Sequence, residues 1–174
     1  MNGLIHIYCG DGKGKTTAAI GLGVRACGRG MHVLLVQFLK GADSGELEVL
    51  RALPGFTVFP NPETLKFTFQ MNEEERAQAA LLCANRFEQA VDSARQGNCD
   101  LLILDEVFGA VSTGMLPEEA LTEFARSKPP ALELVLTGRD PSAQVLALAD
   151  YVSEIKKVKH PFDRNIPARR GIEF

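Results

Sequence analysis

The chain has 174 residues, a length typical of one domain with a sizeable core. Its formal net charge of -3 gives no overall basic field of the kind that binds nucleic acid or a membrane surface. No apolar stretch approaches the length of a membrane span, and no signal peptide precedes the first predicted strand. We therefore expect a single cytoplasmic domain over residues 1–174, of ordinary globular composition.

The four cysteines do not have the spacing of a metal or redox motif, because no two of them form a Cys-x-x-Cys pair. Each lies in or directly beside a predicted strand or helix, so we expect small buried hydrophobic residues in a reducing compartment. They are Cys9, Cys27, Cys83 and Cys99.

Short apolar runs and helical patterns alternate along the chain. Strands are predicted, in chain order, at 3–9, 31–39, 56–59, 100–104, 132–136 and 151–158. Helices are predicted at 16–27, 46–53 and 72–97, from Pro117 onward, and from Asp140-Pro141 onward. Strands that alternate with helices predict an α/β fold, in which a mainly parallel sheet is flanked by helices with right-handed crossovers.

The longest predicted helix covers 72–97. Asn72 can cap its N-terminus, and Glu75 three residues later completes a capping-box pattern. Gly97 stands where a glycine commonly ends a helix. An apolar stripe at three- and four-residue steps is expected to face the core, and it consists of Ala77, Ala80, Ala84, Phe87, Val91 and Ala94.

A glycine-rich turn joins the first predicted strand to the first helix. It consists of Gly10, Asp11, Gly12, Lys13, Gly14, Lys15, Thr16 and Thr17. Glycines let successive backbone N–H groups turn toward phosphate oxygens, and the following helix adds the positive end of its dipole. Lys15 can reach the outer phosphates as a point charge, and the Thr16 hydroxyl can bind Mg²⁺. The sequence therefore predicts a phosphate-binding loop, and an ordinary glycine-rich turn is the weaker alternative.

Two carboxylates, Asp105 and Glu106, follow the strand predicted at 100–104. In phosphate-loop proteins an acidic residue at such a strand end lies beside the loop and holds Mg²⁺, directly or through water. A solvated acidic pair is the alternative, and the phosphate-binding loop favours the metal site.

Two residues near the loop have open roles. A carboxylate among phosphates is repelled, so Asp11 is expected to point outward and accept hydrogen bonds from ribose hydroxyls, or to form the turn without touching a ligand. Arg25, nine residues after Thr16 on the predicted helix, could stack on adenine, or it could be a solvated helix arginine.

Five segments together resemble ATP:cob(I)alamin adenosyltransferases of the phosphate-loop type, from about residue 3 to the C-terminus. They are GDGKGKTTAA (10–19), VQFLKG (36–41), LDE (104–106), TGR (137–139) and VKHPFD (158–163). The common phosphate-loop pattern has glycine where this chain has Cys9, and the family's loop shows the same shift to Gly10. Members often carry an N-terminal helical extension over the active site, which we do not expect here because the first strand begins near residue 3.

The resemblance implies a RecA-like phosphate-loop NTPase fold and a transferase of adenosylcobalamin biosynthesis. The family transfers the 5′-deoxyadenosyl group of ATP to the Co(I) of cob(I)alamin or another corrinoid and releases triphosphate. Because Co(I) is the nucleophile, the protein has to hold C5′ near cobalt and stabilise charge on the leaving group. An electron-donating reductase and a homodimer are further expectations from the family.

The family's functional residues can be carried over to matching positions. Lys13, Lys15 and Glu106 would be catalytic, and the loop 10–17 would bind ATP. Thr16 and Glu106 would be the Mg²⁺ ligands.

The remaining contacts follow from the same resemblance. Asp11 and Arg25 would contact ribose and adenine. The segment Lys66-Phe67-Thr68-Phe69 resembles the family's aromatic segment at the lower side of the corrin. An edge strand with one buried face is the alternative for that segment, and Phe69 stands where some relatives have tryptophan.

Two other functions stay open at this point. One is a different phosphate-loop enzyme, such as a phosphotransferase or a carboxylate-activating ligase. The other is an ATP-dependent switch or a nucleic-acid-binding ATPase module. The acidic net charge opposes nucleic acid, whereas the basic tail at 159–174 slightly favours it. A solvated tail packed over the nucleotide site is the simpler interpretation of those basic residues.

The first testable prediction concerns Phe67 and Phe69. Side chains two residues apart on an extended segment point to the same side, so both rings could exclude water from the lower face of the corrin. Phe67→Ala or Phe69→Ala should impair reaction from cob(II)alamin far more than reaction from pre-formed cob(I)alamin. The check is the four-coordinate cob(II)alamin signal, by magnetic resonance with ATP present, and an unchanged signal in both variants would assign the rings to an ordinary core.

Overall fold

The computed structural model describes residues 2–41, 44–62 and 70–173. These residues form one six-stranded sheet in the order β3-β2-β4-β5-β1-β6, with every neighbouring pair parallel. The strands are β1 (Ile5–Cys9), β2 (Val33–Gln37), β3 (Phe56–Val58), β4 (Leu101–Asp105), β5 (Glu133–Thr137) and β6 (Tyr151–Glu154). The α/β class and the parallel sheet are confirmed.

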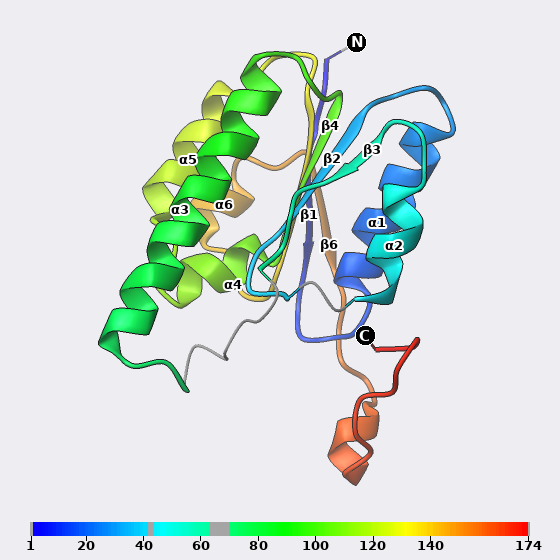
Figure 1. Cartoon of the computed structure of the whole chain (residues 1–174), viewed down its shortest axis with the longest axis vertical. Coiled ribbons are helices and arrows are strands. Elements are labelled where there is room, and N and C mark those ends of the chain that lie inside the picture. Colours follow the sequence, from blue (N-terminus) through cyan, green and yellow to red (C-terminus); the bar gives the residue numbers. More distant parts are fainter. Residues whose placement is uncertain (1, 42–43, 63–69, 174) are drawn as a thin grey trace.

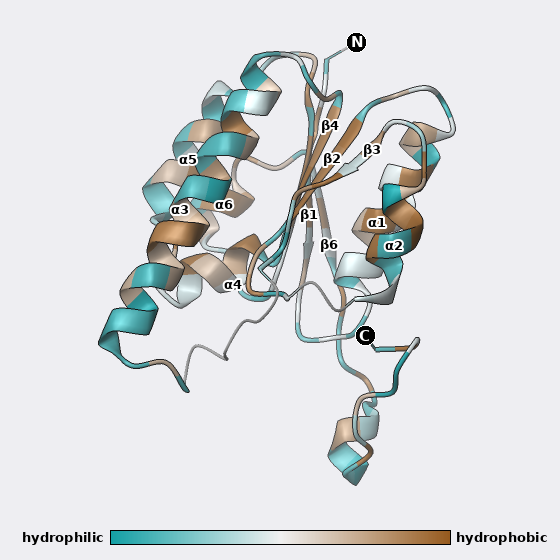
Figure 2. Ribbon diagram, in the orientation of Figure 1, coloured by the Kyte–Doolittle hydropathy of each residue, from teal (hydrophilic) through white to brown (hydrophobic). Residues whose placement is uncertain are grey.

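Helices cover both faces of the sheet (Figure 1). One face carries α1 (Lys15–Cys27) and α2 (Gly45–Arg51). The other carries α3 (Glu73–Arg95), α4 (Val107–Ser112), α5 (Glu118–Ser127) and α6 (Ala143–Leu146). Because the sheet is covered on both sides, β2 and β4 are apolar except for their last residues, and both are buried at all five positions. Figure 2 shows this hydrophobic band of strands between the two helical layers.

The strand order separates the two strands that carry the candidate site. β5 lies between β1, which leads into the glycine-rich loop, and β4, which ends at the acidic pair. This insertion of one strand is the arrangement expected of a RecA-like fold. Because all strands are parallel, their carboxyl ends meet at one edge of the sheet, where ligands of open α/β sheets bind.

The apolar core consists of two clusters, one on each face of the sheet. The larger lies under α3 and α5, where the rings of Phe87 and Phe124 meet edge to face at 6.0 Å between centroids. The smaller lies under α1 and α2 and contains Ala19, Leu47 and Phe56. Both clusters share the sheet, so the position of the loop between β1 and α1 is fixed by packing on either side.

The long helix begins and ends as the sequence predicts. Asn72 accepts a hydrogen bond from the Glu75 amide at 2.9 Å, and the Glu75 side chain accepts from the Asn72 amide at 3.0 Å. Gly97 follows the helix with φ of 74°, a left-handed conformation that suits glycine.

The predicted stripe of that helix is correct only in its second half. Phe87, Val91 and Ala94 are buried, whereas Ala77 is exposed, because the first turns of α3 extend past the end of the sheet (Figure 1). Arg86 is buried as well, which the apolar pattern did not indicate.

Two other helices differ from the prediction. Six residues form α4, which was not predicted because valine, glycine and serine have low helix propensity; burial of Val107 and Phe108 stabilises it. The helix expected from Asp140-Pro141 begins later, because the Ser142 hydroxyl caps α6 by accepting a hydrogen bond from the Val145 amide. Pro117 is the N-cap of α5 and not its first residue.

In the part of the chain that the structure describes, no helix combines the length and the apolarity needed to cross a bilayer.

A stability prediction follows from the packing of α1 on the sheet. A Cβ added at Gly23 would lie 2.9 Å from Cε2 of Phe56 and 3.1 Å from Cδ1 of Ile103. Overpacking costs about 1–3 kcal/mol, more than the roughly 0.5–1 kcal/mol gained by removing a helical glycine. Gly23→Ala should therefore lower the free energy of unfolding in urea.

Gly21 provides the matched control on the same helix. It is exposed, and a Cβ added there meets nothing within 4 Å. Gly21→Ala should raise the free energy of unfolding by about 0.5–1 kcal/mol. Equal effects of the two substitutions would contradict the packing argument.

Candidate nucleotide site

The glycine-rich loop leaves β1 and enters α1 directly, as the sequence predicts. Gly10 and Gly14 have φ of 104° and 123°, a region that residues with a Cβ rarely adopt. Gly14 is the N-cap of α1 and has no side chain with which to cap it. The first amides of the helix are therefore available to an anionic ligand at the positive end of the helix dipole.

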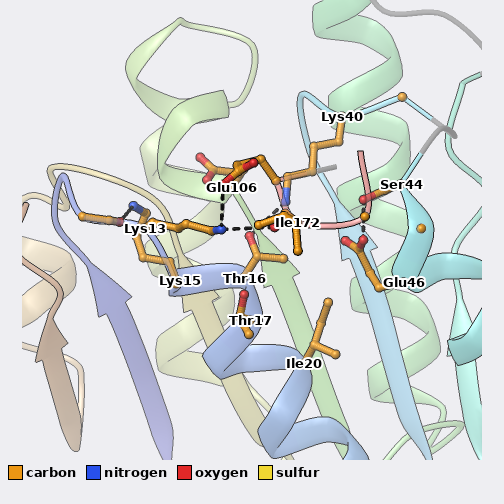
Figure 3. A pocket seen from close by; sticks show the side chains of 16 residues that line it. Lys13, Lys15, Thr16, Thr17, Ile20, Lys40, Ser44, Glu46, Glu106 and Ile172 are labelled. Atoms are coloured by element: carbon orange, nitrogen blue, oxygen red, sulfur yellow. Dashed lines mark hydrogen bonds and ion pairs between the residues drawn. The ribbon is translucent and has the colours of Figure 1, made fainter. Parts of the chain in front are cut away.

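A cavity of about 710 Å³ opens over this loop at the carboxyl edge of the sheet. Its lining comes from the loop and first two turns of α1, from the loop after β2 and the first residues of α2, from Glu106 before α4, and from the end of the chain (Figure 3). The lining residues are Gly12, Lys13, Gly14, Lys15, Thr16, Thr17, Ile20, Lys40, Gly41, Ser44, Gly45, Glu46, Glu106, Gly171, Ile172 and Glu173. The site thus brings together residues that are up to 161 positions apart, from Gly12 to Glu173 (173 minus 12).

The two loop lysines have different partners. Lys15 is only 8% exposed and its Nζ donates to the Gly12 carbonyl at 2.9 Å, across the loop. Lys13 is exposed, and its Nζ donates to the Ile172 carbonyl at 3.1 Å and to Oε1 of Glu173 at 3.2 Å. Residues near the C-terminus therefore lie directly over the phosphate-binding loop, as the solvated-tail interpretation of 159–174 predicts.

The tail is fixed there by charge. Arg169 donates to both carboxylate oxygens of Glu173, at 3.1 Å and 3.2 Å, from its guanidinium. These bonds, chiefly with Arg169 and also with Lys13, lower the pKa of Glu173 to about 2. An ionised carboxylate thus lies beside Lys13. A phosphate oxygen in the same place could accept the hydrogen bond of Lys13 equally well.

Asp11 and Gly12 attach the loop to the segment after β6. The Gly12 amide donates to the Ile155 carbonyl at 2.8 Å, and a Cβ at Gly12 would lie 2.8 Å from that same oxygen. Oδ1 of Asp11 accepts from the Lys157 amide at 2.9 Å, and this bond lowers the pKa of Asp11. Asp11 is exposed and does not line the cavity. Its contact with ribose stays a prediction.

Asp105 is fully buried at the end of β4 and accepts four hydrogen bonds. Its Oδ1 accepts from the hydroxyls of Thr16 at 2.8 Å and Thr137 at 2.7 Å. Its Oδ2 accepts from Nε2 of Gln37 at 3.1 Å and from Nζ of Lys40 at 2.7 Å. A buried carboxylate needs such compensation, and here it orients the threonine that the sequence assigned to Mg²⁺.

Glu106 is the neighbour that faces the cavity. It has φ of 58°, which is unusual for a non-glycine residue, and it forms the N-cap of α4. Its amide donates to the Thr137 hydroxyl at 2.9 Å, and its half-buried side chain lines the cavity (Figure 3). The two carboxylates therefore differ: Asp105 orders the surrounding donors, whereas Glu106 is accessible to a ligand.

Two predicted groups of residues are not brought into this cavity. Arg25 is exposed in the last turn of α1, ten residues and about 15 Å along the helix from Lys15, and it does not line the cavity. Its contact with adenine stays a prediction. Phe67 and Phe69 lie outside the residues that the structure describes.

Lys40 and Gln37 belong to the site but received no role from the sequence. The available signal was their position: both stand at the carboxyl end of a buried strand, where active-site loops of parallel sheets lie. The Gln37 amide also links Asp105 to a second residue, because its Oε1 accepts a hydrogen bond from Nδ2 of Asn61 at 3.0 Å.

Arg86 completes this polar network from the other face of the sheet. Its guanidinium donates to the carbonyls of Pro60 and Gln37 and to Oδ1 of Asn61, the last at 2.7 Å. It also lies 5.2 Å from the ring centre of Phe59, and burial lowers the pKa of Arg86. Arg86 thus joins the end of β2 to the loop that follows β3, at the carboxyl edge of the sheet.

Comparison with known proteins agrees with this geometry. A model of the family described as ATP:corrinoid adenosyltransferase BtuR/CobO/CobP matches residues 1–174. The chain belongs to this family. It is 36% identical over 173 residues to the corrinoid adenosyltransferase of Escherichia coli K12, covering 99% of this chain and 86% of that one.

Two further corrinoid adenosyltransferases are similar over the same length. The corrinoid adenosyltransferase CobA of Salmonella typhimurium is 35% identical, covering 99% of this chain and 86% of that protein. The corrinoid adenosyltransferase of a Sinorhizobium species is 33% identical over 174 residues, covering 99% and 80%. Membership of an enzyme family of this kind confirms the resemblance that the loop, the acidic pair and three further segments indicated.

The corrinoid adenosyltransferase site offers a direct test of its two carboxylates. Glu106→Gln keeps shape and removes charge, so the Mg²⁺ concentration needed for half-maximal turnover should rise, while the free energy of unfolding changes by less than about 0.5 kcal/mol. Asp105→Asn should lower stability by about 3–5 kcal/mol, because an amide cannot accept four hydrogen bonds and Lys40 loses its buried partner. Urea unfolding and Mg²⁺ titration of turnover measure both. A silent Glu106→Gln, with Asp105→Asn alone raising the Mg²⁺ requirement, would assign the metal to Asp105.

Proposed function

We propose that this corrinoid adenosyltransferase transfers the 5′-deoxyadenosyl group of ATP to the Co(I) of a corrinoid and releases triphosphate, with Mg²⁺ at Thr16 and Glu106. The observation that carries the proposal is the meeting of the phosphate-binding loop, Thr16 and Glu106 at one cavity, with Thr16 held by Asp105, in a chain of this family.

The triphosphate would bind at the loop. Free amides at the start of α1 and the ammonium groups of Lys13 and Lys15 face the cavity and complement an anion. Lys15 would turn from the Gly12 carbonyl to a phosphate oxygen, a stronger acceptor. Lys13 would exchange the Glu173 carboxylate for phosphate in the same way.

The donors present fit a magnesium ion that is shared with the substrate. A hydroxyl, a buried carboxylate and a cavity-facing carboxylate come together here, and the ammonium of Lys40 already occupies a cation position among them. The described residues contain no group of three or more His, Cys, Asp or Glu side chains that could hold a metal alone. This suits Mg²⁺, which binds one or two carboxylates together with phosphates and water. When bound, it would neutralise charge on the triphosphate.

The chemistry demands little covalent work from the protein. The cobalt–carbon bond forms as the bond between C5′ and the triphosphate oxygen breaks, so the electron pair comes from Co(I). Burial raises the pKa of all four cysteines, that of Cys99 to about 11, which disfavours a thiolate nucleophile. The chain would therefore act by holding C5′ in place and by stabilising the negative charge of the leaving group.

The corrinoid would approach from the loops after β2 and β3. Arg86 joins the end of β2 to the loop after β3 at the carboxyl edge, and the segment that carries Phe67 and Phe69 follows Asn61 in the sequence. We infer that these two rings face the corrin, that a reductase supplies the electrons, and that the enzyme is a homodimer. These three inferences are supported by the family resemblance alone.

The deciding experiment supplies ATP and chemically reduced cobalamin to the purified protein. We expect the cobalt–carbon chromophore and one triphosphate per adenosylated corrinoid. Lys15→Ala should lower turnover about ten- to a hundredfold, because a charge-assisted hydrogen bond is worth roughly 1.5–3 kcal/mol. Release of orthophosphate and ADP without the chromophore would instead indicate a phosphotransferase or an ATPase switch.

A further inference from the structure

Lys40 lines the cavity, and the reaction described above gives its ammonium group no role. Its Nζ lies 2.9 Å from the Thr16 hydroxyl and 2.7 Å from Oδ2 of Asp105 (Figure 3 shows the contact with Thr16). Its side chain is 29% exposed, so one side of the ammonium faces the cavity. The ammonium thus contacts the Thr16 hydroxyl, which the proposed function assigns to Mg²⁺, and the Asp105 carboxylate that holds this hydroxyl.

The backbone before Lys40 is shaped to place it there. Phe38 is buried and its amide donates to the Asp105 carbonyl at 2.8 Å, which carries the pairing of β2 and β4 one residue past the strand. Leu39 then adopts φ of 54°, a left-handed conformation that a leucine avoids unless its surroundings impose it. Lys40 follows this residue directly, and its Nζ reaches the end of β4 and the first turn of α1.

The other two lysines of the cavity do not occupy this position. Lys15 is bonded to the Gly12 carbonyl and Lys13 to the tail. Lys40 alone among these three contacts Asp105 and Thr16. An ammonium and a divalent cation cannot both bind the Thr16 hydroxyl oxygen, because their charges repel at such distances and they require the same lone pairs.

We propose that Lys40 is a further catalytic residue that exchanges places with the divalent cation. In the nucleotide-free protein its ammonium neutralises Asp105 and blocks the cation position. When the cation arrives with the triphosphate, Lys40 turns on its flexible stem to the phosphate oxygens and stabilises the leaving group. The second half of this cycle rests on the proposed function, whereas the first half depends only on the contacts of the free protein.

The exchange has a measurable consequence for metal binding. The blocked position makes the free protein a poor binder of divalent cations, although the oxygens for one are present. Removing the ammonium should expose these oxygens. The metal would then bind without nucleotide, and this affinity can be measured without ATP or corrinoid.

The experiment uses Mn²⁺ as the probe, because it prefers the same oxygen donors as Mg²⁺ and is detected by magnetic resonance. In nucleotide-free protein, Lys40→Met should bind Mn²⁺ at least tenfold more tightly than the wild type. Arg29→Met is the charge-matched control, since Arg29 is exposed beyond the end of α1 and does not line the cavity. It should leave the Mn²⁺ affinity within about twofold of the wild type. Equal affinities of Lys40→Met and Arg29→Met would overturn the blocking role.

Lys40→Gln covers the event that Lys40→Met destabilises the protein, because its amide still donates to Asp105 without a charge. It should also bind Mn²⁺ more tightly than the wild type. Binding of inorganic triphosphate with Mg²⁺ tests whether Lys40 moves to the phosphate oxygens. Lys40→Met and Lys40→Gln should both bind triphosphate about tenfold more weakly than the wild type. Their rate of adenosyl transfer should fall by a similar factor or more. Unchanged triphosphate affinity would overturn the catalytic role. The Lys40 variants could bind Mn²⁺ more tightly and triphosphate more weakly than the wild type, while the wild type forms no adenosylcorrinoid. That result would contradict only the proposed function.

Discussion

The carboxylate of Asp105 is the constraint on which the site depends. It is fully buried, and a charge in that position is tolerated only because four donors surround it. Those donors come from α1, β2, β5 and the loop after β2, so one carboxylate fixes the relative position of four segments. The hydrophobic clusters on the two faces hold the sheet together, but it is this polar centre that sets the geometry of its carboxyl edge. The phosphate-binding loop is placed by the same centre through Thr16.

Much of the fold could be predicted from local sequence patterns, because the strands of a parallel sheet covered on both faces occur as short apolar runs in the sequence. The strand around Leu101–Asp105 and the capping box of Asn72 and Glu75 are predictable, since apolar runs and caps are local features. The short α4 was missed because it is stabilised by burial and not by propensity. The start of α6 was misplaced because two adjacent capping signals competed, and Ser142 prevailed.

The phosphate-binding loop of the site could be predicted from the sequence, whereas the roles of the residues around the loop were harder to predict. The glycine spacing and the lysine–threonine pair indicate a phosphate-binding loop without further information. The carboxylates at the strand end are part of the same sequence pattern. What no spacing reveals is the difference between Asp105 and Glu106, because one residue along a strand end decides which side chain is enclosed by neighbouring strands. Arg86 escaped notice for a similar reason. A guanidinium on an otherwise apolar helix face is buried here because the end of β2 and the loop after β3 offer it carbonyl oxygens.

A chain of hydrogen bonds leads from Arg86 through Asn61 and Gln37 to Asp105. In each bond, the side chain nearer to Arg86 is the donor. Arg86 can only donate and an ionised carboxylate can only accept, so Asn61 and Gln37 between them are both oriented with oxygen toward the arginine and nitrogen toward the aspartate. The chain of bonds links a cation on α3 to the anion at the end of β4. An acidic residue at either middle position could not donate to the next acceptor, and it would add a second negative charge near Asp105. Replacing one amide alone would therefore leave a polar partner without its hydrogen bond, a constraint on the interior that its apolar packing alone does not impose.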